Sequence, residues 1–98
     1  MTRAEINLLV INTFKQTLLE NGKIFQGEPD DLTPIMGADS SLDSVDLVTF
    51  IVAIEQTLED DWDISIILAD DRAMSQTISP FKSIGSIGNY IEMLVKEK

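Results

Sequence analysis

The stretch that decides the fold is Asp43-Ser-Val-Asp-Leu-Val-Thr-Phe-Ile-Val-Ala-Ile-Glu-Gln-Thr-Leu58, near the middle of a chain of 98 residues. Asp43 is a good N-cap, and Asp46 adds negative charge in the first turn, where the helix dipole favours it. Apolar residues follow at helical spacing, at Val45, Leu47, Val48, Phe50, Ile51, Ile54 and Leu58. The pattern predicts a helix from Ser44 to about Leu58. Because more than half its girth is apolar, this helix should either lie centrally or keep an exposed apolar edge for a partner.

A second helix is predicted near the N-terminus. Thr2 and Glu5 have the spacing of a capping box, in which the Thr hydroxyl accepts a hydrogen bond from the backbone N–H three residues on. Gly22 offers a left-handed stop. Between them, mostly apolar residues recur near helical spacing, at Ile6, Leu9, Val10, Phe14, Thr17 and Leu18. We therefore expect a helix from about residue 3 to about residue 20.

A third main helix is predicted at the C-terminal end. Ser83 is a suitable N-cap, and apolar residues follow it at helical spacing from Ile84 to Val95. Gly85 and Gly88 each weaken this helix by about 1 kcal/mol relative to alanine. Its first turns are therefore expected to be held mainly by packing.

The connection between the first two helices is long. Residues 22–42 lack sustained periodicity and are punctuated by Gly and Pro, so they form a loop that exceeds most connections in compact domains. Such a loop must be packed down on the core. The side chains expected to anchor it, as ordinary core residues, are Ile24, Phe25, Leu32, Ile35 and Met36.

The connection before the last helix is also long. The acidic run 59–61 is expected to end the central helix, and residues 62–66 alternate like a strand that is too short to stand alone, so we expect an extended loop. A brief third helix is expected at 69–74, followed by a polar break at 75–80. The predicted fold class is all-α: a small four-helix bundle, with three main helices and the short third one, in a single domain over residues 1–98.

The charge of the chain limits its partners. Seventeen acidic and seven basic residues give a formal net charge of -10. Nucleic acids and anionic membrane surfaces should therefore be repelled, and basic proteins attracted. Acidity can equally serve only to keep a small domain in solution. The longest early apolar run, Leu8 to Ile11, is far below a signal segment or a membrane span, so a cytoplasmic location is expected.

The chain contains neither cysteine nor histidine. It therefore has no disulfides, no thiolate metal site and no Ser-His or Cys-His catalytic pair. Counting EF-hand positions from Asp39 or from Asp61 places no Gly at the sixth position and no Glu at the twelfth, so we predict no metal site. We do not expect an enzyme. Any reactive hydroxyl must be activated by something outside this chain.

One hydroxyl occupies a distinctive position. In Asp43-Ser-Val45, Ser44 is the first helical residue, where unpaired backbone N–H groups and the helix dipole favour an anion. The sequence here resembles the acyl carrier protein family, whose signature is Asp-Ser-aliphatic at the start of a helix that follows a long loop. The resemblance covers the chain from the first predicted helix to the last and is most specific between Gly37 and Glu55.

The resemblance implies a function. In the family, this serine receives a 4'-phosphopantetheine arm from coenzyme A through a separate magnesium-dependent phosphopantetheinyl transferase (holo carrier synthase), and the arm carries acyl groups as thioesters. Ser44 is the implied attachment point. Acyl-transferring or acyl-modifying enzymes with basic docking patches are the implied partners, and the carrier is expected to be a monomer. The exposed side of the central helix is the implied partner surface. The positions on it that match recognition positions of the family are Asp43, Val45, Asp46, Val48, Val52 and Glu55.

Ser41 competes with Ser44, because Ser41-Leu-Asp-Ser-Val-Asp-Leu-Val48 also resembles the motif when it is moved by three residues. Ser41 lacks a preceding Asp. Moreover, Ala53-Ile-Glu55 lies at the distance from the serine that resembles the family's spacing only when the distance is counted from Ser44. Ser44 is therefore the predicted site.

Departures from the family favour a specialised carrier over a housekeeping fatty-acid carrier. Thr49 and Gln56 replace residues that are commonly acidic in fatty-acid carriers, and the connection over 59–80 is longer than in compact members. A peptidyl carrier domain, or an unmodified acidic helical module that docks on a basic partner, are the alternatives. The acyl group, the pathway and the partner enzymes are not encoded in any recognisable motif.

Overall fold

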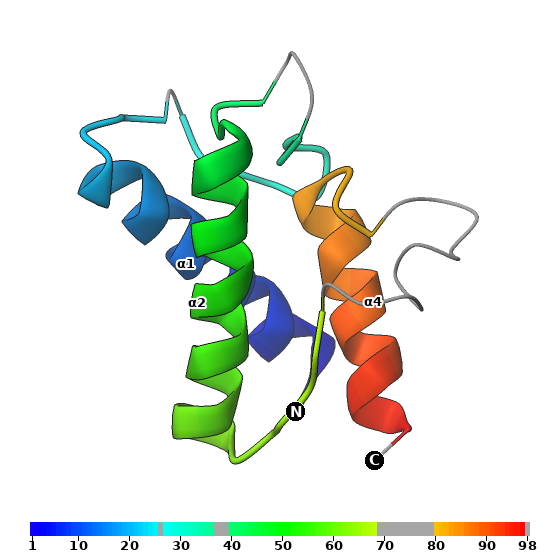
Figure 1. Cartoon of the computed structure of the whole chain (residues 1–98). Helices are drawn as coiled ribbons and strands as arrows, with labels where there is room; N and C mark the ends of the chain where they lie inside the picture. Colours follow the sequence, from blue (N-terminus) through cyan, green and yellow to red (C-terminus); the bar gives the residue numbers. More distant parts are fainter. Residues whose placement is uncertain (26, 37–39, 69–79, 98) are drawn as a thin grey trace.

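The computed structural model of the chain describes residues 1–25, 27–36, 40–68 and 80–97, and of Ser44 only the backbone. These residues form three α-helices: α1 over Arg3–Glu20, α2 over Ser44–Trp62 and α4 over Ile84–Lys96. In Figure 1, α1 crosses behind α2, and α4 stands beside them. The all-α prediction is confirmed for the described residues, which show three helices rather than a four-helix bundle. The predicted short helix at 69–74 lies outside the described residues.

The first helix begins and ends as its sequence predicts. The Thr2 hydroxyl accepts from the Glu5 backbone N–H at 3.2 Å, and the Glu5 carboxylate accepts from the Thr2 N–H at 2.7 Å. At the other end, Gly22 adopts a left-handed conformation with φ 72°. Both predicted boundary signals, the capping box and the glycine stop, are therefore confirmed.

The central helix is longer than predicted. The acidic run 59–61 does not end α2, which continues through Trp62 until Asp63 turns left-handed at φ 54°. The three acidic side chains are exposed, so water screens their mutual repulsion and one more helical turn can form. The Ile64 N–H then donates to the Leu58 carbonyl at 2.9 Å and closes the helix. The extended loop predicted from residue 62 is thus wrong for Trp62, which is helical.

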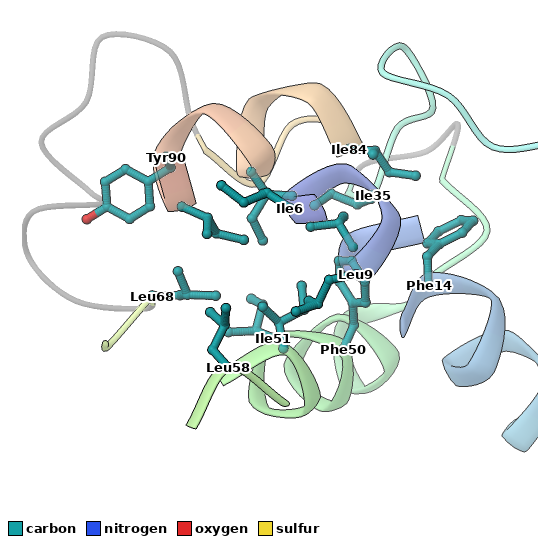
Figure 2. Close-up of a cluster of buried hydrophobic side chains, with 14 of the residues drawn as sticks. Ile6, Leu9, Phe14, Ile35, Phe50, Ile51, Leu58, Leu68, Ile84 and Tyr90 are labelled. Atoms are coloured by element: carbon teal, nitrogen blue, oxygen red, sulfur yellow. The ribbon is translucent and has the colours of Figure 1, made fainter. Parts of the chain in front are cut away.

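One apolar core joins the three helices (Figure 2). Phe50 of α2 and Phe14 of α1 are fully buried, and their rings meet edge to face with centroids 6.0 Å apart. Phe25, from the loop after α1, packs edge to face on Phe14 at 5.5 Å. Leu68, beyond the end of α2, is also fully buried, and its N–H donates to the Glu55 carboxylate at 2.8 Å. The segment after α2 therefore turns back along that helix.

The long α1–α2 loop is anchored differently from the prediction. Of the five predicted anchors, Ile35 is fully buried and Phe25 packs on the core, but Ile24, Leu32 and Met36 are exposed. The turn at residues 30–33 explains the outward position of Leu32, because its N–H donates to the Asp30 carboxylate at 3.0 Å. The prediction that those three side chains are buried core anchors is therefore wrong.

Backbone hydrogen bonds to the start of α4 hold it instead. The Ile35 N–H donates to the Lys82 carbonyl at 3.2 Å, the Ile84 N–H to the Thr33 carbonyl at 3.0 Å, and the Gly85 N–H to the Asp31 carbonyl at 2.9 Å. A β-carbon at Gly85 would lie 2.8 Å from that carbonyl oxygen. The glycine that weakens α4 as a helix is therefore what allows the loop to approach it.

Gly85→Ala is expected to lower the free energy of unfolding by about 1–3 kcal/mol, although alanine is the better helix former, because the clash is with backbone that cannot rotate away. Gly88→Ala is the matched control. A β-carbon there would meet only the side-chain ends of Arg3 and Asn7, at 3.0 Å or more, and these can move. Urea unfolding followed by circular dichroism measures both; a Gly85→Ala protein as stable as the parent would contradict this account of the loop.

Candidate functional site

The first turn of α2 is closed by two acidic residues. The Asp43 carboxylate accepts from the Asp46 N–H at 2.8 Å, and the Asp46 carboxylate accepts from the Asp43 N–H at 3.5 Å, a reciprocal capping box. Asp43 itself has an extended backbone, with φ -85° and ψ -177°. The helix therefore begins at Ser44, and both the predicted start and the predicted cap are confirmed.

This position gives Ser44 a distinct electrostatic setting. It is the first helical residue, so the backbone N–H groups of the first turn and the positive end of the α2 dipole lie beside it. An anionic group attached here is stabilised by that end of the helix.

A lysine ties this turn to the end of α1. The Lys23 ammonium donates to the Asp46 carboxylate at 2.5 Å and to the Ser41 carbonyl at 3.3 Å, and lies 3.9 Å from the Asp43 carboxylate. The hydrogen bond from Lys23 holds the pKa of Asp46 below its ordinary value, and the same bond raises the pKa of Lys23. We call the charged residues Lys23, Asp43 and Asp46 the Lys23 clamp. It fixes the loop end of α1 against the turn that carries Ser44.

The clamp changes the role expected for Asp46. Its side chain is only 6% exposed, and its carboxylate is bonded to Lys23 and to the backbone N–H of the capping box. The prediction that Asp46 lies on the exposed side of α2 with the other recognition positions is therefore wrong. A carboxylate at the third helical position can reach back to the cap, and this inward path buries it.

The other predicted recognition residues lie as follows. Val45, Val48 and Val52 are exposed and spaced by three and four residues, so they share one side of α2; we call them the valine stripe. Asp43 is exposed at the start of the helix. Glu55 is half-buried, and one of its oxygens accepts from Leu68. An apolar strip with an acidic residue at one end is thus available to a partner.

Lys23 is the site residue that sequence reasoning missed. It lies in an aperiodic loop, 23 positions from Asp46, so no local pattern links the two. The available signal was that basic residues are scarce: with seven basic and seventeen acidic residues, each lysine or arginine has several acidic residues with which it could pair. That signal does not identify which acidic residue pairs with Lys23.

The shifted pKa values of Asp46 and Lys23 make the stability of the fold depend on pH. Because the folded pKa of Asp46 is depressed, its contribution is fully present above the unfolded value of about 4 and is lost as the pH falls through the lower folded pKa. The raised pKa of Lys23 gives a contribution that is present below about pH 10 and is lost as the pH rises through the higher folded pKa.

Urea midpoints of the parent and of Asp46→Asn, compared at several pH values, test this. The parent is expected to be the more stable across neutral pH, and the difference is expected to shrink as the pH falls below about 4. Taking the difference removes the contribution of the carboxyl groups that lie away from the Lys23 clamp. A gap that stays constant from neutral to acid pH would show that the Asp46 charge does not stabilise the fold.

The described part of the chain has neither a cluster of metal-binding side chains nor a helix that could span a membrane. No group of three or more acidic side chains there is arranged to hold a metal ion. None of the described helices is long and apolar enough to cross a membrane. Comparisons with protein-family models, with curated proteins and with solved structures found no match to this chain.

Proposed function

We propose that this chain is an acyl carrier protein that holds acyl intermediates on a 4'-phosphopantetheine arm attached to Ser44. The observation that carries the proposal is that α2 begins at Ser44, directly after an Asp43 N-cap and a long loop. This is the local structure that the Asp-Ser-aliphatic resemblance requires. The arm, when bound, supplies the thiol on which an acyl group is held as a thioester.

The residues around Ser44 support attachment in three ways. The start of α2 favours the negative charge of the phosphodiester. The Lys23 clamp and the capping box keep the turn helical, so Ser44 is presented in one backbone geometry. The chain has no histidine or cysteine, so a separate transferase must activate the hydroxyl. The carrier itself performs no chemistry on the acyl group.

The valine stripe is the surface proposed for acyl-handling enzymes and for the transferase. Exposed Asp43 lies at its start, and the chain as a whole carries a charge of -10. A basic patch on the partner would be steered toward this side of α2, and the three valines would then supply a small apolar contact. Charge contributes mainly to the association rate, and the apolar contact to the lifetime of the complex.

The test of the proposed function is a covalent one. The purified protein, free of any prior modification, is incubated with a phosphopantetheinyl transferase of broad specificity, coenzyme A and magnesium, and its intact mass is measured. The expected mass gain equals one phosphopantetheine group. A mass that stays unchanged while a known carrier in the same tube is modified would contradict the proposal.

The exposed valine stripe favours a second candidate, an unmodified acidic interaction module, because the stripe is available to a partner whether or not Ser44 is modified. Such a module would lose partner binding on Val48→Asp and would be indifferent to Ser44→Ala. A carrier would lose acyl transfer on both changes. A peptidyl carrier domain would accept the arm in the same way and would differ in the group it carries.

A further inference from the structure

A groove separate from the Ser44 site runs between α1 and α2. It has a volume of about 550 Å³ and is lined by one side of α1 and by the C-terminal half of α2, from Ala53 to Trp62. Figure 1 shows the two helices that line it, with α1 crossing behind α2. At 3.6 residues per turn, the lining positions Ala53, Thr57 and Asp61 fall on a different side of α2 from the valine stripe. A molecule in the groove would therefore leave the stripe and the start of α2 uncovered.

Two large apolar side chains of the groove are exposed. Leu8 of α1 is 61% exposed and Trp62 of α2 is 38% exposed, and both line it. Tryptophan in a concave surface is the side chain that most often anchors a protein contact, because it offers a large apolar area with little loss of conformational freedom. Exposed apolar surface framed by polar residues is typical of an interaction site.

The charge of the groove has a single sign. The ionisable residues that line it are Glu5, Glu20 and Asp61, and neither lysine nor arginine is among its lining residues. An anionic lipid or a nucleic acid would therefore be repelled. A second copy of this chain, with its own net charge of -10, would also be disfavoured. A cationic occupant would gain from all three carboxylates.

The length of the groove fits a helix. The lining residues of α1 extend from Glu5 to Glu20, which corresponds to about 22 Å along the helix axis and matches a partner helix of about 15 residues. We propose that the α1–α2 groove binds a basic amphipathic helix of a partner protein, with its apolar face on Leu8 and Trp62 and its lysines or arginines against Glu5, Glu20 and Asp61. This site is independent of Ser44 and of the proposed carrier function.

The chain carries its own reporter, because Trp62 is its one tryptophan. The probe is an amidated helical peptide of about 15 residues, built from leucine and lysine and free of tryptophan. Titration into the full chain is expected to shift the Trp62 emission to shorter wavelength and to saturate. A peptide of the same pattern with glutamate in place of lysine should give no shift. Absence of a saturable shift with the lysine peptide would overturn the proposal.

Matched charge variants separate the groove from general attraction to an acidic protein. Glu20→Lys/Asp61→Lys changes the groove, and Asp31→Lys/Glu59→Lys makes the same change in net charge at exposed positions outside its lining. The groove variant is expected to bind the lysine peptide about tenfold or more weakly, and the control less than about threefold. Equal weakening in both would show charge attraction alone and overturn the proposal.

The apolar contact is tested at Leu8. Leu8→Ser removes an exposed side chain, so the fold should survive, and affinity for the lysine peptide is expected to fall about fivefold or more. Unchanged affinity would overturn the proposal. A blue shift that depends only on protein concentration would assign the groove to a second copy of the chain and overturn the proposal. A blue shift produced by a fatty acid and not by the peptide would assign the groove to an acyl chain and would also overturn it. Ser44→Ala should bind the peptide as the parent does.

Discussion

Replacing Phe50 with alanine is expected to lower the free energy of unfolding by about 3–5 kcal/mol. Phe50 is fully buried, and its ring meets Phe14 edge to face, while Phe14 in turn contacts Phe25 from the α1–α2 loop. The substitution would therefore leave a cavity beside Phe14, between α1 and α2 (Figure 2), close to the ring that the loop contributes. For a domain whose total stability is of the order of 5–15 kcal/mol, this is a large share.

Denaturant unfolding followed by circular dichroism measures this loss. Val48→Ala is a suitable control, because Val48 lies on the same helix with an exposed side chain and should change stability by no more than about 0.5 kcal/mol. If Phe50→Ala lowered the free energy of unfolding by less than about 1 kcal/mol, the rings of Phe14, Phe25 and Phe50 would not form the centre of the core. The account of how α1 packs on α2 would then be wrong.

The helices were predictable because each carries local signals. Thr2 with Glu5 and Asp43 with its first turn mark where two helices begin, and the structure has both capping boxes at those residues. Apolar spacing then identifies the sides that face the core. The end of α2 was not predictable in this way. Nothing in the acidic run 59–61 prevents the helix from continuing. The helix ends at Asp63, which adopts a left-handed backbone conformation without a glycine to signal it in the sequence.

The tertiary contacts were the least predictable part of the site. The Lys23 clamp joins residues that are far apart in sequence, and its formation buries Asp46, which the motif alone places among exposed recognition residues. The loop provides a second case. Its attachment to α4 runs through backbone groups, such as the Gly85 N–H and the Asp31 carbonyl, and a backbone hydrogen bond is independent of side-chain type. Residue patterns therefore do not predict either contact.

Ser44→Ala is expected to abolish modification by the transferase completely, because the hydroxyl is the only atom the change removes from the proposed attachment point. The fold should be retained, since the cap and the clamp are supplied by Asp43, Asp46 and Lys23. Circular dichroism and the urea midpoint check that retention. Ser41→Ala is the control: this serine is exposed in the loop before α2 and lies outside the helix, so its loss should leave modification intact.

The measurement that tests the central claim most directly is the intact mass of the parent, Ser44→Ala and Ser41→Ala proteins after the same exposure to transferase and coenzyme A. The account predicts a gain of one phosphopantetheine group on the parent and on Ser41→Ala, and none on Ser44→Ala. A gain that persists in Ser44→Ala, or a parent protein that is never modified, would contradict the assignment of the first residue of α2 as the attachment point.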